Sequence, residues 1–293
     1  MDCYRLEEVD GENPLFQQID ATYVIHLEDN GRLGTVKKEL REFYPSKNTC
    51  ILFNKGFKRC NKDLPKNESQ FDIVDANLFI FRDAQRKQYK NILVLEDDFF
   101  FHKEIRANEN CTRVDEFIEG KQDDTCTYFL GCLPFLALPC DTDFKHYALL
   151  FGTTCHSVIY SQKYREEILL VEQGKILDWD IFQWFFQPSS RYMYHMPLCY
   201  QLFPVTDNSK NWGNQTPFMK LGGSIGFQIF QLIKLDVQVD PGYSSCYFLS
   251  KTWMFVLVFL FLVFLFLVFV LWQNKLSNYF YKKRDLRRRL FFR

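Results

Sequence analysis

Three adjacent carboxylates follow an apolar run in the stretch KNILVLEDDFFF (90–101). The aliphatic residues before Glu96 are typical of a buried strand. A desolvated cluster of Glu96, Asp97 and Asp98 would persist by taking up protons or by holding a cation. Carboxylate oxygens suit Mg²⁺ or Mn²⁺, whose coordination is completed by water and substrate phosphates. The stretch therefore predicts a cation site for a nucleotide diphosphate, with an exposed acidic turn after an edge strand as the alternative.

The elements around this stretch alternate between strand and helix. Strands are expected at 21–28, 50–54 and 92–97, and amphipathic helices at 33–44 and 71–89. This order predicts right-handed crossovers and an α/β fold, with a parallel sheet covered by helices on both faces. Ligands of such sheets bind beyond the carboxyl ends of the strands, which is where the three carboxylates fall.

The second half of the chain is less regular but still of α/β type. Strands are expected at 127–133 and 154–161, followed by a helix at 162–173 that Ser161 caps. The aromatic stretch LDWDIFQWFF (177–186) is expected to be helical. Its two acidic residues, Asp178 and Asp180, stand in the first turn of that helix.

Four stretches carry a resemblance in the order in which they occur: YVIHLEDNGR (23–32), ILVLEDDFFF (92–101), GTTCHSVIYS (152–161) and LDWDIF (177–182). Together they resemble the family 25 glycosyltransferases, which include lipopolysaccharide and procollagen galactosyltransferases and have relatives in large DNA viruses. The similarity covers roughly residues 20 to 210. It implies a GT-A fold with a Rossmann-like nucleotide-sugar-binding sheet, and inverting transfer of galactose or glucose from a UDP-sugar to a glycan, protein or lipid hydroxyl.

The resemblance also implies roles for the acidic stretch. Glu96 and Asp98 match the metal motif and would hold Mn²⁺, or Mg²⁺, on the donor diphosphate, with Glu96 and Asp97 on the donor side. Arg32, which follows the first strand, and Asn54, which ends the second, are assigned to the donor as well. The turn after the first strand is less rich in arginine than the family pattern, and no third protein ligand for the metal is evident.

Inversion requires a general base for the acceptor hydroxyl, and Asp178 or Asp180 is the candidate. The alternative for this pair is capping of a helix N-terminus, where a carboxylate offsets the helix dipole. On the acceptor side, Trp179 and Trp212 could stack on sugar rings. Asn208 lies in a polar stretch, 201–213, that is the preferred acceptor loop; an ordinary surface connection is the alternative.

Charge divides the chain into two unlike parts. Residues 273–293 carry eight Lys or Arg against one Asp, so the rest of the chain has about seven more acids than bases and does not resemble a nucleic-acid-binding surface. The segment 253–272 has no charge and a Trp at each end, which predicts a single transmembrane helix rather than a buried core helix. The basic tail suits an anionic lipid surface or serves to stop transfer.

These patterns predict the domain organisation: an N-terminal extension (1–20), a glycosyltransferase domain (21–240), a juxtamembrane linker (241–252), the membrane span (253–272) and the basic tail (273–293). The first 20 residues contain no apolar segment, which favours a cytosolic domain. The positive tail argues for the opposite orientation. Ten cysteines without a CxxC pair are expected to be mostly reduced thiols, and sequons stand at Asn67, Asn110 and Asn214.

Two other functions remain open at this stage. The acidic cluster could serve a Mg²⁺-dependent phosphodiester hydrolase, although the acidic balance of the chain disfavours a nucleic-acid substrate. The domain could also be a non-catalytic scaffold that organises partners at a membrane. Donor binding that is lost on changing Asp98 would separate the transferase from the scaffold.

Overall fold

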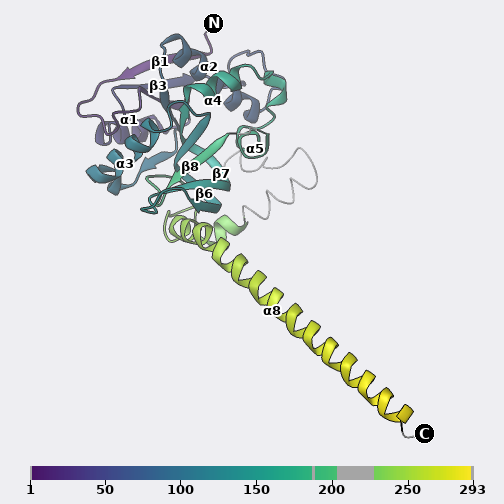
Figure 1. The fold of residues 1–293 in the computed structure, drawn as a ribbon. Coiled ribbons are helices and arrows are strands. Elements are labelled where there is room, and N and C mark those ends of the chain that lie inside the picture. The colour runs from purple at the N-terminus through teal and green to yellow at the C-terminus, as the bar shows by residue number, and fades with distance from the viewer. Residues whose placement is uncertain (1, 187–188, 203–227, 292–293) are drawn as a thin grey trace. The chain divides into compact units, whose positions relative to one another are not determined.

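The computed structural model describes residues 2–186, 189–202 and 228–291 (Figure 1). The chain divides into two compact units, Met1–Ser250 and Lys251–Arg293. The first unit contains a mixed α/β sheet with helices, and the described residues of the second unit, 251–291, are helical.

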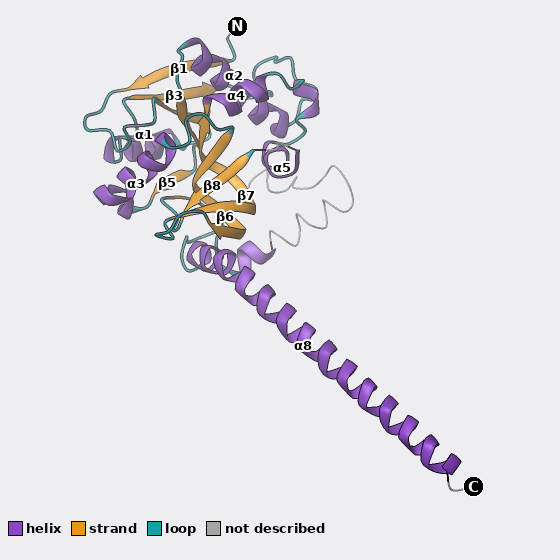
Figure 2. Ribbon diagram, viewed as in Figure 1, coloured by secondary structure: helices purple, strands orange, loops and turns teal. Residues whose placement is uncertain are grey.

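The main sheet has seven strands in the order β1-β3-β2-β4-β7-β6-β8 (Figure 2). Neighbours β3, β2 and β4 are parallel, as predicted, whereas β1 and β7 add to this block in the antiparallel direction. The strand bounds are β1 (Tyr4–Val9), β2 (Ala21–Leu27), β3 (Asn48–Asn54), β4 (Asn91–Glu96), β6 (Cys126–Pro139), β7 (His146–Ser161) and β8 (Ser190–Tyr194).

Helices cover both faces of this sheet, which confirms the layered arrangement expected from the sequence. Side chains alternate along the strands, so that Tyr23 and Val94 pack with one core cluster while Val24 and Leu95 pack with the other. The first cluster includes α2 (Ser69–Arg86), α4 (Gln162–Leu169) and α5 (Trp179–Ile181); the second includes α1 (Leu33–Glu42) and α3 (Asn108–Glu119).

The three phenylalanines after the acidic residues form a strand of their own. Strand β5 (Phe99–Phe101) pairs antiparallel with β9 (Cys199–Gln201). Phe99 and Phe101 are buried in the same cluster as α1 and α3, and Phe100 packs beside Tyr200. The apolar residues on both sides therefore anchor the acidic turn between β4 and β5.

The second half of the sheet departs from the predicted parallel pattern. Strands β6 and β7 form a long antiparallel hairpin that extends the predicted strands by several residues, with register shifts along β6. A hairpin forms because the connection between these strands is too short for a crossover. Helix α4 begins where predicted, and the Ser161 side chain accepts a hydrogen bond from Tyr164 N. The aromatic stretch after α5 continues as a π-helix, Phe182–Phe186.

Two predicted domain boundaries are corrected by the packing of the chain. Residues 1–20 are not merely an extension, because β1 pairs with β3 along its whole length. The predicted linker 241–252 likewise contributes to the core, since Tyr243 and Tyr247 are almost completely buried. Neither contribution could be anticipated from local pattern, because both depend on partners distant in the sequence.

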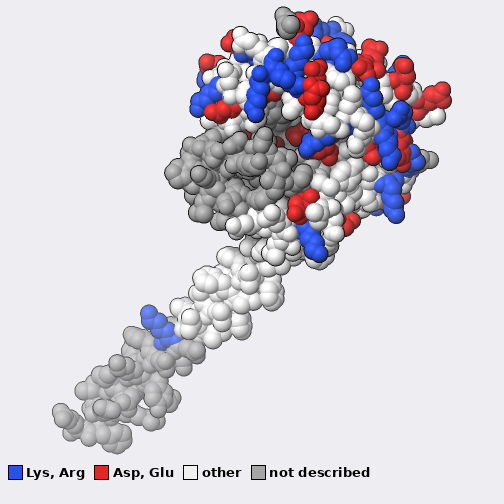
Figure 3. Space-filling model, turned by 180° about the vertical axis from the view of Figure 1, so that it is seen from behind, with Lys and Arg blue, Asp and Glu red and all other residues white. Residues whose placement is uncertain are grey.

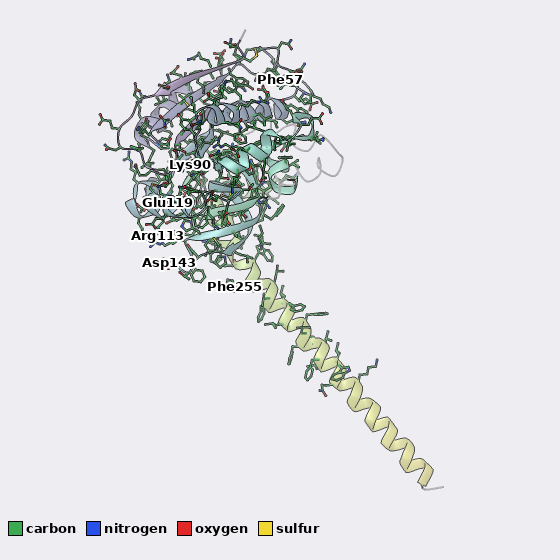
Figure 4. The ribbon with its side chains drawn as sticks, turned by 45° about the horizontal axis from the view of Figure 1, so that its top comes forward. Phe57, Lys90, Arg113, Glu119, Asp143 and Phe255 are labelled. Atoms are coloured by element: carbon green, nitrogen blue, oxygen red, sulfur yellow. A yellow bond between two sulfur atoms is a disulfide. The ribbon has the colours of Figure 1, made fainter. Side chains whose placement is uncertain are left out.

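Helix α8 (Gly242–Phe291) contains the predicted membrane segment. Its part Gly242–Gln273 is long and apolar enough to cross a membrane. Figure 3 shows the described side chains of 255–272 without acidic or basic atoms. Phe255, which is labelled in Figure 4, points away from the helix axis and is 71% exposed. By its length and composition, this helix could serve as a membrane anchor.

Candidate active site

The three carboxylates lie at the carboxyl edge of the parallel strands. Glu96 ends β4, and Asp97 and Asp98 form the turn into β5. In the parallel register Ile25 of β2 lies opposite Glu96, so the loop that follows β2 comes out beside the acidic turn. The sheet thus brings the residues of 26–32 and 96–98 together.

Asp97 is the structural anchor of this edge. One of its oxygens accepts hydrogen bonds from His26 Nδ1 at 2.8 Å, from Leu27 N at 3.0 Å and from the Asn30 amide. The other accepts from Arg32 Nη1 at 2.9 Å. Although burial opposes ionisation, these donors hold the pKa of Asp97 below its ordinary value. With both oxygens engaged inside the protein, the predicted donor contact of Asp97 is replaced by a positioning role.

The loop between β2 and α1 has a backbone shaped for these contacts. Asp29 and Gly31 have φ values of 61° and 78°, in the left-handed region. The Asn30 side chain accepts a hydrogen bond from Arg32 N at 3.0 Å while its amide donates to Asp97. The tight turn therefore directs both Asn30 and Arg32 onto the acidic edge.

Glu96 and Asp98, in contrast, are poorly compensated. Burial raises the pKa of Glu96 well above its ordinary range, and the charges of Asp98 and Asp180 raise it further. Burial also raises the pKa of Asp98, against the opposing effect of Arg32. Asp98 accepts hydrogen bonds from Arg32 Nη1 at 3.1 Å and from Gln201 Nε2 at 2.9 Å. The two carboxylates form a desolvated like-charge pair, as the sequence suggested.

Arg32 was predicted to contact donor phosphates, and in the structure its guanidinium bridges Asp97 and Asp98 instead. The side chain is one-third exposed. Arg32 therefore partly neutralises the acidic edge. A contact between Arg32 and the donor phosphates stays a prediction, and it would require Arg32 to exchange a carboxylate partner for a phosphate.

The two base candidates are in different environments. Asp178 Oδ1 accepts from Ile181 N at 3.0 Å and so caps α5, which realises the capping alternative. Asp180 accepts hydrogen bonds from the Cys155 thiol and from Thr154 N. Burial, followed by the neighbouring charge of Asp178, raises the pKa of Asp180 to about 7. A carboxylate that titrates near neutral pH is suited to general base catalysis, so Asp180 is the stronger candidate.

A backbone irregularity in β7 brings this strand to Asp180. Thr154 has a φ of 69° and lies where the β6–β7 register is interrupted. Its buried hydroxyl has no hydrogen-bond partner in the part of the chain that the structure describes. A β-branched residue in the left-handed region is strained, and such residues concentrate at functional sites. The bulge places the Cys155 thiol and the Thr154 N–H where both reach Asp180.

Other predicted site residues are not available for ligands. Asn54 is 3% exposed and its side chain is fully used: it donates to Asp72 Oδ2 and accepts from Lys62 Nζ and Gly56 N. Its predicted donor contact is therefore wrong. Trp179 is 3% exposed and donates from Nε1 to Tyr160 Oη at 3.0 Å, so its ring belongs to the core and cannot stack on an acceptor sugar.

The remaining acceptor-side predictions, Asn208 and Trp212, lie outside the described residues. Several side chains at the site were missed by sequence reasoning: His26, Asn30, Cys155 and Gln201. His26 and Asn30 stand inside the stretch 23–32 that carried the family resemblance, so their position was signalled without their role. Gln201 begins the polar stretch 201–213 that was predicted as the acceptor loop, but its contact with Asp98 was not signalled, because it depends on the pairing of β9 with β5.

The arrangement fits a divalent cation in one specific way. In the described part of the chain no group of three His, Cys, Asp or Glu side chains is placed to hold a metal. Glu96 and Asp98 offer two carboxylates whose mutual repulsion a cation would relieve. Two carboxylates match the way in which Mg²⁺ and Mn²⁺ bind with substrate phosphates, and do not match a closed all-protein site. His156, fully buried with a pKa lowered to about 3 by burial, is a core residue.

Comparisons with known proteins give weak structural likenesses. No family model matches the chain, and no curated protein matches it. A197 from STIV is 12% identical with a TM-score of 0.37, over 64% of this chain and 86% of that one. A glycosyltransferase involved in the glycosylation of the major capsid of PBCV-1 is 10% identical with a TM-score of 0.31, over 51% and 63%.

A third likeness is to the mannose-1-phosphate geranyltransferase from Thermus thermophilus, with 10% identity and a TM-score of 0.35 over 61% of this chain and 74% of that one. Two of these three structural neighbours are transferases. TM-scores below 0.5 do not establish a common fold or activity. The functional argument therefore depends on the residues of this chain.

Proposed function

We propose that the globular unit is a GT-A-like, metal-dependent, inverting glycosyltransferase of the family 25 type, which moves a hexose from a UDP-sugar to a hydroxyl of a glycan, protein or lipid. The observation that carries the proposal is the gathering of Glu96, Asp98 and Asp180 at the carboxyl edge of the sheet, each with a raised pKa. The choice of hexose and nucleotide comes from the sequence resemblance. Helix α8 would anchor the enzyme in a membrane.

In this proposal the acidic edge divides into holding and positioning groups. Glu96 and Asp98 would hold Mn²⁺ or Mg²⁺, which stabilises the charge that develops on the departing nucleoside diphosphate. Asp97 keeps the turn and the β2–α1 loop in place through its four hydrogen bonds. Arg32, which contacts Asp98, would pair its guanidinium with a phosphate oxygen of the donor when Asp98 holds the cation.

Asp180 would act as the general base. It would accept the proton of the acceptor hydroxyl while that oxygen attacks the anomeric carbon and the bond from this carbon to the diphosphate breaks. The Cys155 thiol and Thr154 N–H hold the carboxylate in one orientation. Attack on the face opposite the leaving group gives inversion.

The test is binding and turnover of nucleotide sugars by the full chain in detergent. Thermal unfolding should be measured with a panel of UDP-sugars, with and without Mn²⁺. One donor should raise the free energy of unfolding in the presence of Mn²⁺, by roughly 3 kcal/mol at ~100 times its dissociation constant. Asp98→Asn should abolish that rise. Asp143→Asn, which removes an exposed carboxylate paired with Arg113, is the matched control and should keep it.

The same samples separate the alternatives. A well-folded protein that shows no rise with any donor would favour the non-catalytic scaffold. Metal-dependent cleavage of a phosphodiester without any response to nucleotide sugars would favour the hydrolase. Formation of a glycosylated acceptor with inverted anomeric configuration, measured by proton NMR, would establish the transferase reaction.

A further inference from the structure

The loop between β3 and α2 is fixed to the rest of the globular unit in two ways. A disulfide joins Cys60 in this loop to Cys3, just before β1, across a Cα–Cα distance of 5.6 Å. Two residues further on, the Lys62 ammonium is buried between Asp72, Asn54 Oδ1 and Tyr4 Oη. Figure 4 labels Phe57 in the same loop. The other eight cysteines of the chain are free thiols, and six of them are buried.

The disulfide bears on the compartment in which the unit folds. Disulfides persist in oxidising compartments and are rare where thiol reductants maintain cysteines in the reduced form. Cys3 and Cys60 are 57 residues apart, so their pairing closes a long loop and fixes β1 against the strand that it neighbours. The free thiols do not oppose this interpretation, because buried thiols are protected from exchange.

The end of this loop and the first residue of α2 form an exposed acceptor sequence. Asn67-Glu68-Ser69 is an Asn-X-Ser sequon, and all three residues are exposed. The sequon Asn110-Cys111-Thr112 differs sharply. Asn110 donates to Glu104 O at 2.7 Å and accepts from Tyr194 Oη at 2.8 Å, and Cys111 is buried. Asn67 is exposed to solvent, whereas a glycan on Asn110 would replace the hydrogen bonds to Glu104 and Tyr194.

The charges beside the apolar segment point in the same direction. Residues 273–292 contain seven Lys or Arg, and residues 233–252 contain two. The flank that is richer in Lys and Arg stays on the cytosolic side of a membrane. With a single span, the globular unit then lies on the opposite side.

From these three independent observations we propose that the globular unit lies on the non-cytosolic, oxidising side of a membrane and carries an N-linked glycan on Asn67. The first 20 residues alone favour a cytosolic domain, so the proposal places the globular unit on the opposite side from that expectation. The proposal does not depend on the glycosyltransferase activity. It assigns a modification site, a structural disulfide and an orientation together.

Both covalent steps use reactants of such a compartment. The Asn67 amide nitrogen loses one proton and bonds to the anomeric carbon of a lipid-diphosphate-linked oligosaccharide; the bond from that carbon to the diphosphate breaks, and the lipid diphosphate leaves. The Cys3 and Cys60 thiols lose two protons and two electrons to a disulfide-bearing oxidoreductase, which is reduced to its dithiol.

The experiment is translation of the full chain in the presence of endoplasmic-reticulum microsomes. Every sample carries Asn214→Gln, which removes the third sequon of the unit. We then expect one endoglycosidase-sensitive step in gel mobility, lost in Asn67→Gln and in Ser69→Ala but kept in Ser69→Thr, which preserves the sequon. Asn110→Gln should also keep it. Added protease should remove the basic tail and leave the glycosylated unit protected.

A step that persists in Asn67→Gln, or the absence of any step, would overturn the proposal. A second readout concerns the disulfide. Alkylation of the denatured, unreduced protein should label eight thiols, and ten after reduction. Ten labels before reduction would contradict an oxidising compartment, whatever the result for the sugar-transfer activity.

Discussion

Two buried polar clusters stand at the carboxyl ends of β3 and β4, the parallel strands on either side of β2, and they differ in how their charges are compensated. At the end of β3, the Lys62 ammonium contacts Asp72, Asn54 and Tyr4, so one cation meets one carboxylate and each side chain has partners. At the end of β4, burial and then the charges of Asp98 and Asp180 raise the pKa of Glu96, and Arg32 contacts Asp97 and Asp98.

The difference separates a structural cluster from a functional one. A buried pair with its hydrogen bonds satisfied holds its elements in place, and removing one member leaves an uncompensated charge. A cluster with more carboxylates than cations lowers the free energy of unfolding. A bound cation, or a proton taken from a substrate, relieves the repulsion between these carboxylates, which suits such a cluster to binding or catalysis. The predictions below test this contrast from both sides.

The largest effect is expected on turnover when the proposed base is removed. Asp180→Asn should lower kcat by about 10² to 10⁴-fold, because the acceptor hydroxyl loses its proton acceptor. Metal-dependent donor binding should remain. Steady-state kinetics with the donor found in the thermal screen would check this, and a variant with nearly full kcat would remove Asp180 from the mechanism.

The β3 cluster should respond in stability. Lys62→Met would leave Asp72 buried without its cation and should lower the free energy of unfolding by roughly 3 to 5 kcal/mol. Lys37→Met, which removes a half-exposed partner of Glu7, should cost below about 1 kcal/mol. Urea unfolding of both variants measures the contrast, and equal effects would refute it.

The pH dependence of stability should reveal the excess carboxylate. Because the pKa of Asp180 is raised to about 7 in the folded state, the folded protein binds more protons than the unfolded chain between about pH 4 and pH 7. Stability contributed by the protonated group is therefore lost as pH rises through this window. Asp180→Asn should be more stable than the wild type by on the order of 1 to 4 kcal/mol above pH 7, with a difference near zero at pH 4.

Smaller effects should distinguish the neighbours of Asp180. Asp178→Ala removes the cap of α5 and should lower the free energy of unfolding by about 1 kcal/mol.

Arg32→Gln removes the cation that lowers the pKa of Glu96 and Asp98, so the midpoint pH for metal-dependent donor binding should move upward. Titration of donor binding against pH would test the direction; an unchanged midpoint would mean that Arg32 does not tune the acidic edge.

The hydrophobic pattern of the sequence was sufficient to predict the strands and the helix that position the site residues. Strand β2, helix α1 and strand β4 were predicted because hydrophobic periodicity and chain length decide them locally. Strand β1 and the buried first turns of α8 were missed because their burial depends on residues far along the chain. The Cys3–Cys60 disulfide was missed for the same reason, since spacing alone does not give connectivity.

The sequence by itself determined that three carboxylates end a buried strand, that an apolar helix of membrane-spanning length follows the globular unit, and that a basic tail follows the helix. The tertiary structure decided which of the three carboxylates is held ionised and which have a raised pKa. Asp97 meets four donors from the β2–α1 loop and is held ionised, whereas Glu96 and Asp98 remain poorly compensated. Residue type fixes the charge a side chain can carry, but burial and hydrogen-bonding partners, which only the fold assembles, fix how strongly it holds its proton.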